Sequence, residues 1–229
     1  MGFVIPVPSQ PSVPVAGTDD LFPVRRIWCV GRNYAAHARE MGGDPNKEAP
    51  FFFAKPFDSL VMAGARIPYP SLTQNLHHEV ELVVALKSGG SDLTPEQAKD
   101  CVYGYAVGID LTRRDLQELA KKSGRPWEIG KSFDRSAPIG IIHPASAIGH
   151  PAQGGVALKV NGELRQSGDL ADMIWRVPEV LSHLSQLVRL EAGDLIFTGT
   201  PEGVGPLHKG DHVEASIEGV GSLEITISP

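Results

Sequence analysis

The stretch NLHHEVELVVAL at residues 75–86 constrains the fold most, because it places two carboxylates one residue apart within an apolar run. Side chains alternate between the faces of a strand, so Glu79 and Glu81 share one face while Val80 points to the other. Val83 continues the glutamate face as an apolar position, so the pair opens onto a buried surface. Two adjacent carboxylates repel each other unless a proton or a cation lies between them. A solvent-facing strand edge is the usual explanation of a lone Glu-X-Glu, but here the apolar continuation favours a metal site.

Asp110 is the natural third ligand, because it ends the apolar stretch VYGYAVGID where the chain enters a helix. The alternative for Asp110 is a turn or capping residue at the start of that helix. Three carboxylates without cysteine form a hard oxygen site, which favours Mg²⁺ or Mn²⁺ over zinc. His77 shares the face of Glu79 and could also ligate, although a single histidine is more often a hydrogen-bonded structural residue.

The patterning predicts more strands than helices. Strands are expected at residues 25–31, 51–55, 76–86, 102–110, 156–166, 193–201, 211–219 and 221–228. The Asn-Gly pair inside 156–166 is a strong hairpin signal. Helices are expected at residues 34–41, 112–124 and 177–188, the second with Thr112 and Asp115 at the spacing of a capping box. With 25 Gly and 19 Pro, this pattern predicts an α+β fold that is mainly β, a rolled or sandwiched mixed sheet with a few short helices.

Length and composition exclude several classes of protein. A chain of 229 residues suits one catalytic domain over 21–229, preceded by an extended Pro-rich segment over 1–20. With 21 basic and 27 acidic residues and no basic run, nucleic acid is not an expected partner. No stretch is long and apolar enough for a membrane span, and the N-terminus lacks the pattern of a signal peptide. The two cysteines form no CxxC motif, so reduced thiols in the cytoplasm are expected.

Six segments in order resemble the fumarylacetoacetate hydrolase superfamily, and within it the single-domain acylpyruvate hydrolases, especially bacterial fumarylpyruvate hydrolases. They are VGRNYAAHAREMG, FFFAKP, HHEVELVVAL, GYAVGIDLTRRDLQ, RPWEIGKSFD and GDLIFTGTPEGVGPL. The resemblance extends from about Arg26 to the C-terminus. It implies the mixed β-sandwich roll of the family's C-terminal domain, a homodimer, and Mg²⁺ or Mn²⁺ held by Glu79, Glu81 and Asp110. Members of the family cleave a carbon–carbon bond in a 2,4-dioxo acid, and acylpyruvates release pyruvate.

The same matching places Arg114, Gln117, Lys131 and Thr200 at positions that contact substrate. Arg114 and Gln117 are three residues apart on the helix that follows Asp110, so both can face the site, and Arg suits a substrate carboxylate. Lys131 would add a fixed positive charge near the substrate carboxylate or near the enolate that develops as the bond breaks. Without the resemblance, these side chains would be read as a solvated helix face, a surface lysine and an ordinary turn.

Three further sets of residues complete the predicted site. His37 and Glu40 lie three apart on a short helix, so the carboxylate can orient the imidazole as a base for the attacking water. In the family this segment acts as a lid, whereas by itself the pair would be a surface ion pair. Lys55 either contacts substrate or braces the site. Arg32 and Tyr34 begin the lid segment, and Tyr34 either packs or binds substrate.

The sequence therefore supports a metal-dependent hydrolase of an acylpyruvate, with fumarylpyruvate, split to fumarate and pyruvate, as the preferred substrate. The alternative on the same site is a decarboxylase or isomerase of a 2-oxo diacid such as oxaloacetate. A third alternative is a non-catalytic β-domain in which the carboxylates hold an ion for structural reasons. The acyl group, the physiological metal and the balance between hydrolysis and decarboxylation stay open at this point.

Overall fold

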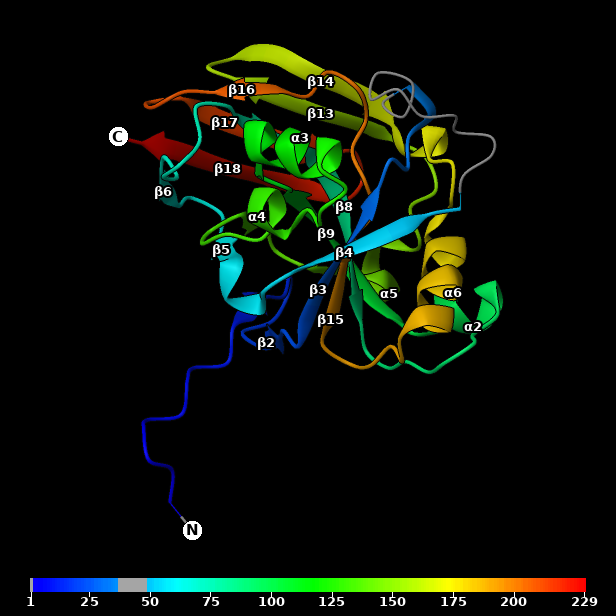
Figure 1. The fold of residues 1–229 in the computed structure, drawn as a ribbon. Helices are drawn as coiled ribbons and strands as arrows, with labels where there is room; N and C mark the ends of the chain where they lie inside the picture. The colour runs from blue at the N-terminus through cyan, green and yellow to red at the C-terminus, as the bar shows by residue number, and fades with distance from the viewer. Residues whose placement is uncertain (1, 37–48) are drawn as a thin grey trace.

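The computed structural model describes residues 2–36 and 49–229, and strands dominate this part of the chain (Figure 1). The strands are β1 (Ser12–Pro14), β2 (Leu21–Pro23), β3 (Arg26–Gly31), β4 (Phe51–Lys55), β5 (Leu60–Met62), β6 (Arg66–Pro68), β7 (Leu76–His78), β8 (Val80–Leu86), β9 (Val102–Ile109), β10 (Thr112–Arg113), β11 (Ala137–Ile139), β12 (His143–Pro144), β13 (Gly155–Val160), β14 (Glu163–Asp169), β15 (Asp194–Phe197), β16 (Gly205–Leu207), β17 (His212–Ile217) and β18 (Gly221–Ser228). The α-helices are α2 (Pro95–Asp100), α3 (Arg114–Lys122), α4 (Glu128–Lys131), α5 (Ala145–Ile148) and α6 (Val177–Leu187), with 3-10 turns η1 (Phe57–Ser59) and η2 (Leu170–Asp172).

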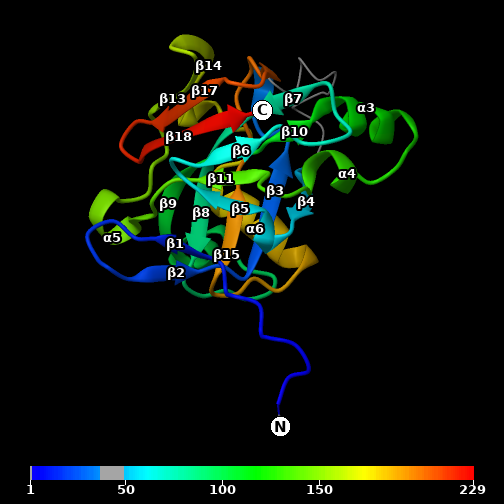
Figure 2. The same ribbon diagram turned by 90° about the vertical axis from the view of Figure 1, so that its left-hand side faces the viewer.

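Two large sheets form the body of the molecule. One has the order β4-β3-β15-β8-β9-β11-β5, with β12 also pairing with β9, and the other has the order β14-β13-β17-β18-β6. Parallel pairs such as β3 with β15 occur beside antiparallel pairs such as β8 with β9, so the sheets are mixed. The second sheet lies across one end of the first, with α6 and α2 packed together at the side (Figures 1 and 2). The predicted α+β, mainly β fold is confirmed.

Strand β8 lies at the centre of the first sheet, and both of its faces are buried. Leu82 and Val84 pack into the core that also holds inward side chains of β13, β17, β18 and α6. Val83 and Ala85 pack into a second core on the opposite face, which the β1–β2 pair covers. A strand covered on both faces carries a nearly continuous apolar run. The face that Glu79 and Glu81 open onto is therefore core, as the sequence predicts.

Local sequence signals predicted a hairpin turn correctly and the start of a helix incorrectly. Asn161 and Gly162 join β13 to β14 with φ values of 53° and 82°, the two left-handed residues that a tight hairpin turn requires. The capping box predicted at Thr112 and Asp115 is wrong. Thr112 lies in β10 and donates its hydroxyl to the carbonyl of Asp110 at 3.1 Å, and the Asp115 carboxylate accepts from the hydroxyl of Thr73 at 2.6 Å. Tertiary contacts thus take both side chains away from the helix end.

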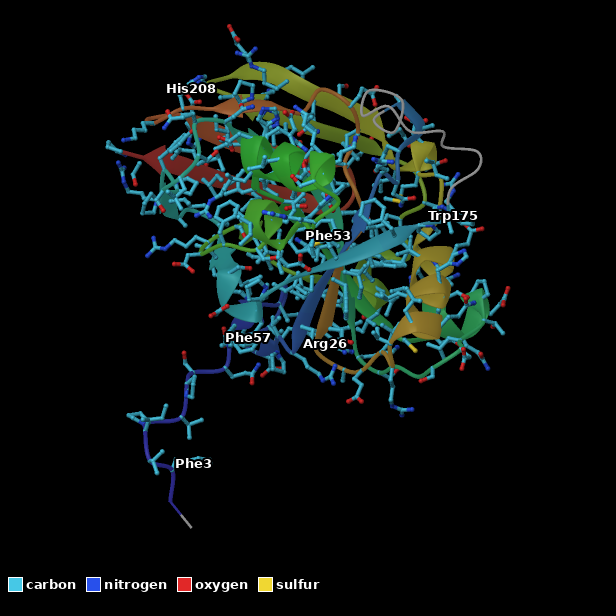
Figure 3. The ribbon with its side chains drawn as sticks, in the orientation of Figure 1. Phe3, Arg26, Phe53, Phe57, Trp175 and His208 are labelled. Carbon is cyan, nitrogen blue, oxygen red and sulfur yellow. The ribbon has the colours of Figure 1, made fainter. Side chains whose placement is uncertain are left out.

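The described N-terminal residues leave the folded body as an extended segment, and Phe3 lies far from either sheet (Figure 3). Phe3 is 83% exposed, whereas the side chain of Gln10 already donates a hydrogen bond to the carbonyl of Val24. Elsewhere, no helix in the described residues combines the length and apolar character needed to cross a bilayer.

Candidate active site

The site begins at a break in strand pairing. Strand β7 ends at His78 and β8 begins at Val80, so Glu79 lies between them, where its carbonyl accepts a hydrogen bond from the Asp110 amide at 2.8 Å. Asp110 follows directly after β9, the neighbour of β8. This backbone contact brings Asp110 beside Glu79, and Glu81 lies two residues further along. One carboxylate oxygen from each residue lies within 4.8 Å of the others, and all three side chains are buried.

Three buried cations face these carboxylates. Lys131, the last residue of α4, lies 2.7 Å from a carboxylate oxygen of Glu79 and 2.7 Å from one of Asp110. The ammonium of Lys55, at the end of β4, lies 2.8 Å from the other oxygen of Asp110. Arg114, the first residue of α3, donates to the second oxygen of Glu79. Burial opposes the charged form of Lys131, but Asp110 and Glu79 outweigh it and raise the pKa of this lysine.

Glu81 differs from the other two carboxylates. It accepts one hydrogen bond of 2.7 Å from the Gly199 amide, and no lysine or arginine in residues 2–36 and 49–229 forms an ion pair with it. Burial, together with the neighbouring Asp110 and Glu79, raises the pKa of Glu81 well above its usual range. Within the described residues, this carboxylate therefore has no ion-pair partner.

The three carboxylates fit a divalent cation. Besides Glu81, one oxygen of Asp110 is buried and makes no hydrogen bond within the described chain, although Lys55 lies close to it in poor alignment. The Glu81 carboxylate has no ion-pair partner and this Asp110 oxygen has no hydrogen bond within the described chain. Oxygen ligands of this kind, in a cluster with no sulfur donor, suit a hard ion such as Mg²⁺ or Mn²⁺. Glu79, Glu81 and Asp110 would hold that ion.

A small cleft opens above the carboxylates. Its polar lining includes Arg114, Gln117 and Thr200 in addition to the carboxylates and Lys131. Gln117 lies one turn after Arg114 on α3 and accepts a 2.5 Å hydrogen bond from its guanidinium. The predicted substrate contacts on α3 and after β15 thus face the same space.

One wall of the cleft is apolar, and no local sequence pattern predicts it. Val30, Phe53 and Trp127 form this wall. The Trp127 ring packs edge-on against Phe51 with ring centroids 4.8 Å apart, and it lies 6.2 Å from the ring of Phe53, which is marked in Figure 3. These residues come from β3, β4 and the start of α4, which are separated along the chain, so only the fold brings them together.

The remaining predicted residues lie in different places. Arg32 lines the cleft. Lys55 is 2% exposed beneath Asp110 and also donates to the carbonyl of Leu111 at 3.2 Å, a position that favours bracing over substrate contact. Tyr34 is 1% exposed, pairs through its backbone with Met173 and is not part of the cleft lining, so packing describes it better than binding.

Histidine 77 does not join the carboxylates. Its Nδ1 atom accepts from the Arg114 guanidinium at 3.3 Å and its Nε2 atom lies 2.9 Å from the side-chain oxygen of Asn75. Burial, followed by the charge of Arg114, lowers the pKa of His77 to about 4, so the ring is neutral near pH 7. This is the hydrogen-bonded structural role. His37 and Glu40, predicted to activate water, lie outside the described residues.

Known proteins similar to this chain share one domain and have several activities. The family described as fumarylacetoacetate (FAA) hydrolase C-terminal matches residues 26–228. The crystal structure of fumarylpyruvate hydrolase from Pseudomonas aeruginosa in complex with Mn²⁺ and pyruvate is 52% identical with a TM-score of 0.97, and the match covers 99% of each chain. The mitochondrial oxaloacetate tautomerase FAHD1 of Mus musculus is 43% identical over 212 residues, 90% of this chain and 96% of that protein. The structure of 5-carboxymethyl-2-hydroxymuconate delta-isomerase from Mycobacterium smegmatis is 30% identical, with a TM-score of 0.80 and coverage of 96% of this chain and 82% of that one.

Proposed function

We propose that this chain, which belongs to the fumarylacetoacetate hydrolase family, is a divalent-cation-dependent acylpyruvate hydrolase that cleaves fumarylpyruvate to fumarate and pyruvate. The observation that carries the proposal is the convergence of three buried carboxylates beneath a cleft that Arg114 and Lys131 border. The similarity to a fumarylpyruvate hydrolase over 99% of both chains supports the choice of substrate.

The charges of the site favour an anionic substrate. Glu79, Glu81 and Asp110 face three cations, so the ionised side chains alone sum to zero, and a bound divalent ion would leave two positive charges in a buried place. A 2,4-dioxo acid carries a carboxylate and gains a second negative charge as its bond to the pyruvoyl half breaks. The surplus positive charge therefore stabilises the transition state, which carries the additional negative charge, more than it stabilises the bound substrate.

The bound cation would supply Lewis-acid polarisation of the pyruvoyl oxygens. Arg114 offers a planar guanidinium for the substrate carboxylate, and its contacts with Glu79 and Gln117 hold it in place. Lys131 keeps an ammonium beside Glu79 and Asp110, where it stabilises negative charge that grows on a nearby oxygen. Thr200 adds a hydroxyl to the lining of the cleft.

The acyl half would lie along the apolar wall. A fumaryl group is flat, and the rings of Phe53 and Trp127 offer flat apolar surfaces in the cleft. Arg32 lines the same cleft and is the cation we assign to the second carboxylate of fumarylpyruvate. Lys55, a predicted substrate contact, lies beneath Asp110 instead. Activation of the attacking water is assigned to His37 with Glu40, as the sequence predicts.

The direct test mixes the purified protein with Mg²⁺ or Mn²⁺ and fumarylpyruvate. Loss of the diketone absorbance and release of pyruvate at the same rate are expected, with no activity after chelation. Asp110→Asn serves as the matched inactive control, since it keeps the side-chain shape but weakens the cation site. Absence of turnover by the unmodified protein with either metal would remove fumarylpyruvate as the substrate.

A second candidate function is the tautomerisation or the decarboxylation of oxaloacetate. The 43% identity with oxaloacetate tautomerases favours it, because the two reactions can share a cation site that stabilises an enolate. The two are separated by His37→Ala, which should abolish hydrolysis, where water must be activated, while leaving activity on oxaloacetate largely intact. If both activities disappear together, the role assigned to His37 is wrong.

We also propose a homodimer in the cytoplasm, from the family resemblance and the cysteines. Both cysteines, Cys29 and Cys101, are buried and free, as expected for a reducing compartment. Light scattering after size-exclusion chromatography measures the mass of the assembly, and a value near the chain mass of 24.5 kDa would contradict the dimer.

A further inference from the structure

Gln166 connects two parts of the site without lining the cleft. It lies on β14 and is fully buried. Its side-chain oxygen accepts from the Val80 amide at 3.1 Å and lies 2.9 Å from Nδ1 of His78. Its side-chain nitrogen donates to the hydroxyl of Thr200 at 2.8 Å and to the carbonyl of Pro201 at 2.9 Å. All four hydrogen-bonding positions of the amide are therefore used.

The orientation of this amide follows from its backbone partners. The Val80 amide can only donate and the Pro201 carbonyl can only accept, so the oxygen must face Val80 and the nitrogen must face Pro201. Two consequences follow. The His78 ring carries its proton on Nδ1, because it faces an atom that only accepts. The Thr200 oxygen receives a hydrogen from Gln166, because it faces an atom that only donates.

A hydroxyl that already accepts from its neighbour keeps its own hydrogen for another acceptor. Thr200 lines the cleft, and within residues 2–36 and 49–229 its hydroxyl donates to no protein atom. The hydrogen is thus available to an oxygen of a molecule bound in the cleft. If Thr200 pointed its hydrogen at residue 166 instead, its lone pairs would face an anionic ligand and repel it.

We propose that Gln166 is a positioning residue, which makes the Thr200 hydroxyl a hydrogen-bond donor toward an anionic oxygen in the cleft. The other end of the same amide holds His78 and Val80, the two neighbours of Glu79, so one buried side chain fixes the donor relative to the carboxylates. The identity of the acceptor as an acylpyruvate oxygen rests on the proposed function. The hydrogen-bond direction rests on geometry alone.

The substitution Gln166→Glu tests the direction of this hydrogen bond. Glutamate keeps the shape of the side chain and accepts from His78 and Val80 as before, but an ionised carboxylate cannot donate to Thr200. The Thr200 hydroxyl then turns its hydrogen toward residue 166. Calorimetric titration of pyruvate into protein saturated with Mn²⁺ should show affinity weakened by about 10- to 100-fold, the range of one hydrogen bond to a charged group.

A double-mutant cycle with Thr200→Val separates this effect from added negative charge or a general disturbance. In the Thr200→Val background there is no hydroxyl to reorient, so adding Gln166→Glu should change pyruvate affinity by less than about threefold. Titration of Mn²⁺ alone serves as the second readout and should be similar with and without the Gln166 change. An equal loss of pyruvate affinity in both backgrounds, or no loss in the unmodified background, would overturn the proposal.

The side-chain amide of the unmodified protein gives an independent measurement if Gln166→Glu does not fold. Its two protons should appear as slowly exchanging signals in NMR spectra, and the one facing Thr200 should shift when pyruvate is added with Mg²⁺. No shift would contradict the proposal.

Pyruvate binding needs no turnover, so binding and a non-additive cycle without fumarylpyruvate hydrolysis would remove only the proposed function. Hydrolysis with an additive cycle would remove only this inference, and failure of the unmodified protein to bind pyruvate would overturn both.

Discussion

Replacing Lys131 with methionine should destabilise the protein strongly when metal is removed and much less when Mn²⁺ is present. The Lys131 ammonium lies 2.7 Å from Glu79, 2.7 Å from Asp110 and 2.7 Å from the Thr112 hydroxyl, and the side chain is 2% exposed. Removing one partner from a buried ion pair costs about 3–5 kcal/mol, because the remaining charge is left uncompensated. For a chain of this size that corresponds to a melting temperature lower by roughly 6–20 °C.

A divalent cation should replace the lost charge, since the same two carboxylates would hold it. In the unmodified protein the cation and the ammonium would share Glu79 and Asp110, whereas in Lys131→Met the cation alone would neutralise them. Metal binding stabilises the folded state of both proteins, so the gap between them narrows only as far as Lys131→Met binds the cation more tightly. Tighter binding is expected because the variant has no ammonium competing for the carboxylates, and a recovery of about 1.5–2.5 kcal/mol corresponds to an affinity roughly 10- to 70-fold higher. The gap in melting temperature between the two proteins should therefore shrink to less than half when EDTA is replaced by saturating Mn²⁺.

Thermal unfolding followed by circular dichroism, with EDTA and with Mn²⁺, measures both gaps. Lys122→Met is the matched control, because Lys122 is an exposed lysine on α3 and its loss should change stability by no more than about 0.5 kcal/mol in either condition. A gap of equal size with and without Mn²⁺ would refute the reasoning, since it would mean that the lysine and the cation do not share the carboxylates.

Three further outcomes follow from the structure. The pKa of His77 is about 4 in the folded chain and about 6.5 when unfolded, so the unfolded state binds more protons between these pH values and stability falls as pH drops through them. Because the ring is partly exposed, screening limits this effect to roughly 1–2 kcal/mol. Denaturant titrations of His77→Gln should therefore show a flatter dependence of stability on pH. Glu81→Gln should weaken Mn²⁺ binding by at least about tenfold in calorimetry. The metal-free protein should be equally or more stable, because burial raises the pKa of the Glu81 carboxyl and a neutral amide has no charge to bury. A lower melting temperature in EDTA would contradict this. Gly130→Ala places a Cβ atom 2.8 Å from the backbone nitrogen of Gln117, so α4 must move away from α3 at a cost of about 1–3 kcal/mol in denaturant titrations, and an unchanged stability would show that the helices shift freely.

The carboxylates were predictable because their signal is local. Glu79 and Glu81 interrupt an apolar run, and Asp110 ends another, so alternation along a strand and the hardness of oxygen ligands suffice to group them. The hairpin at Asn161 was predictable for the same reason, since the turn and its residues are adjacent. The strand assignments rest on periodicity over a few residues, and the fold class follows from their number.

The rest of the site depends on contacts between distant residues. Nothing next to Lys55 in the sequence says that its ammonium will lie under Asp110, 55 positions further on. The wall formed by Phe53 and Trp127 exists because β4 and α4 pack together. Gln166 lies in a hairpin whose other polar residues face solvent, and only its burial distinguishes it. The sequence contains these residues, but their roles appear when the sheets close.

The break between β7 and β8 explains how one carboxylate of the site acquires its cationic partners. At Glu79 the ladder is interrupted, and the first residue of α3 and the last of α4 can bring Arg114 and Lys131 against it. Glu81, the second residue of β8, forms no ion pair with these cations, and within the described residues its carboxylate accepts from the Gly199 amide. The described residues therefore compensate Glu79 and Asp110 with their own charges, and a bound cation would compensate Glu81. This asymmetry predicts that replacing Glu81 weakens the affinity for a divalent cation more than replacing Glu79 or Asp110 does.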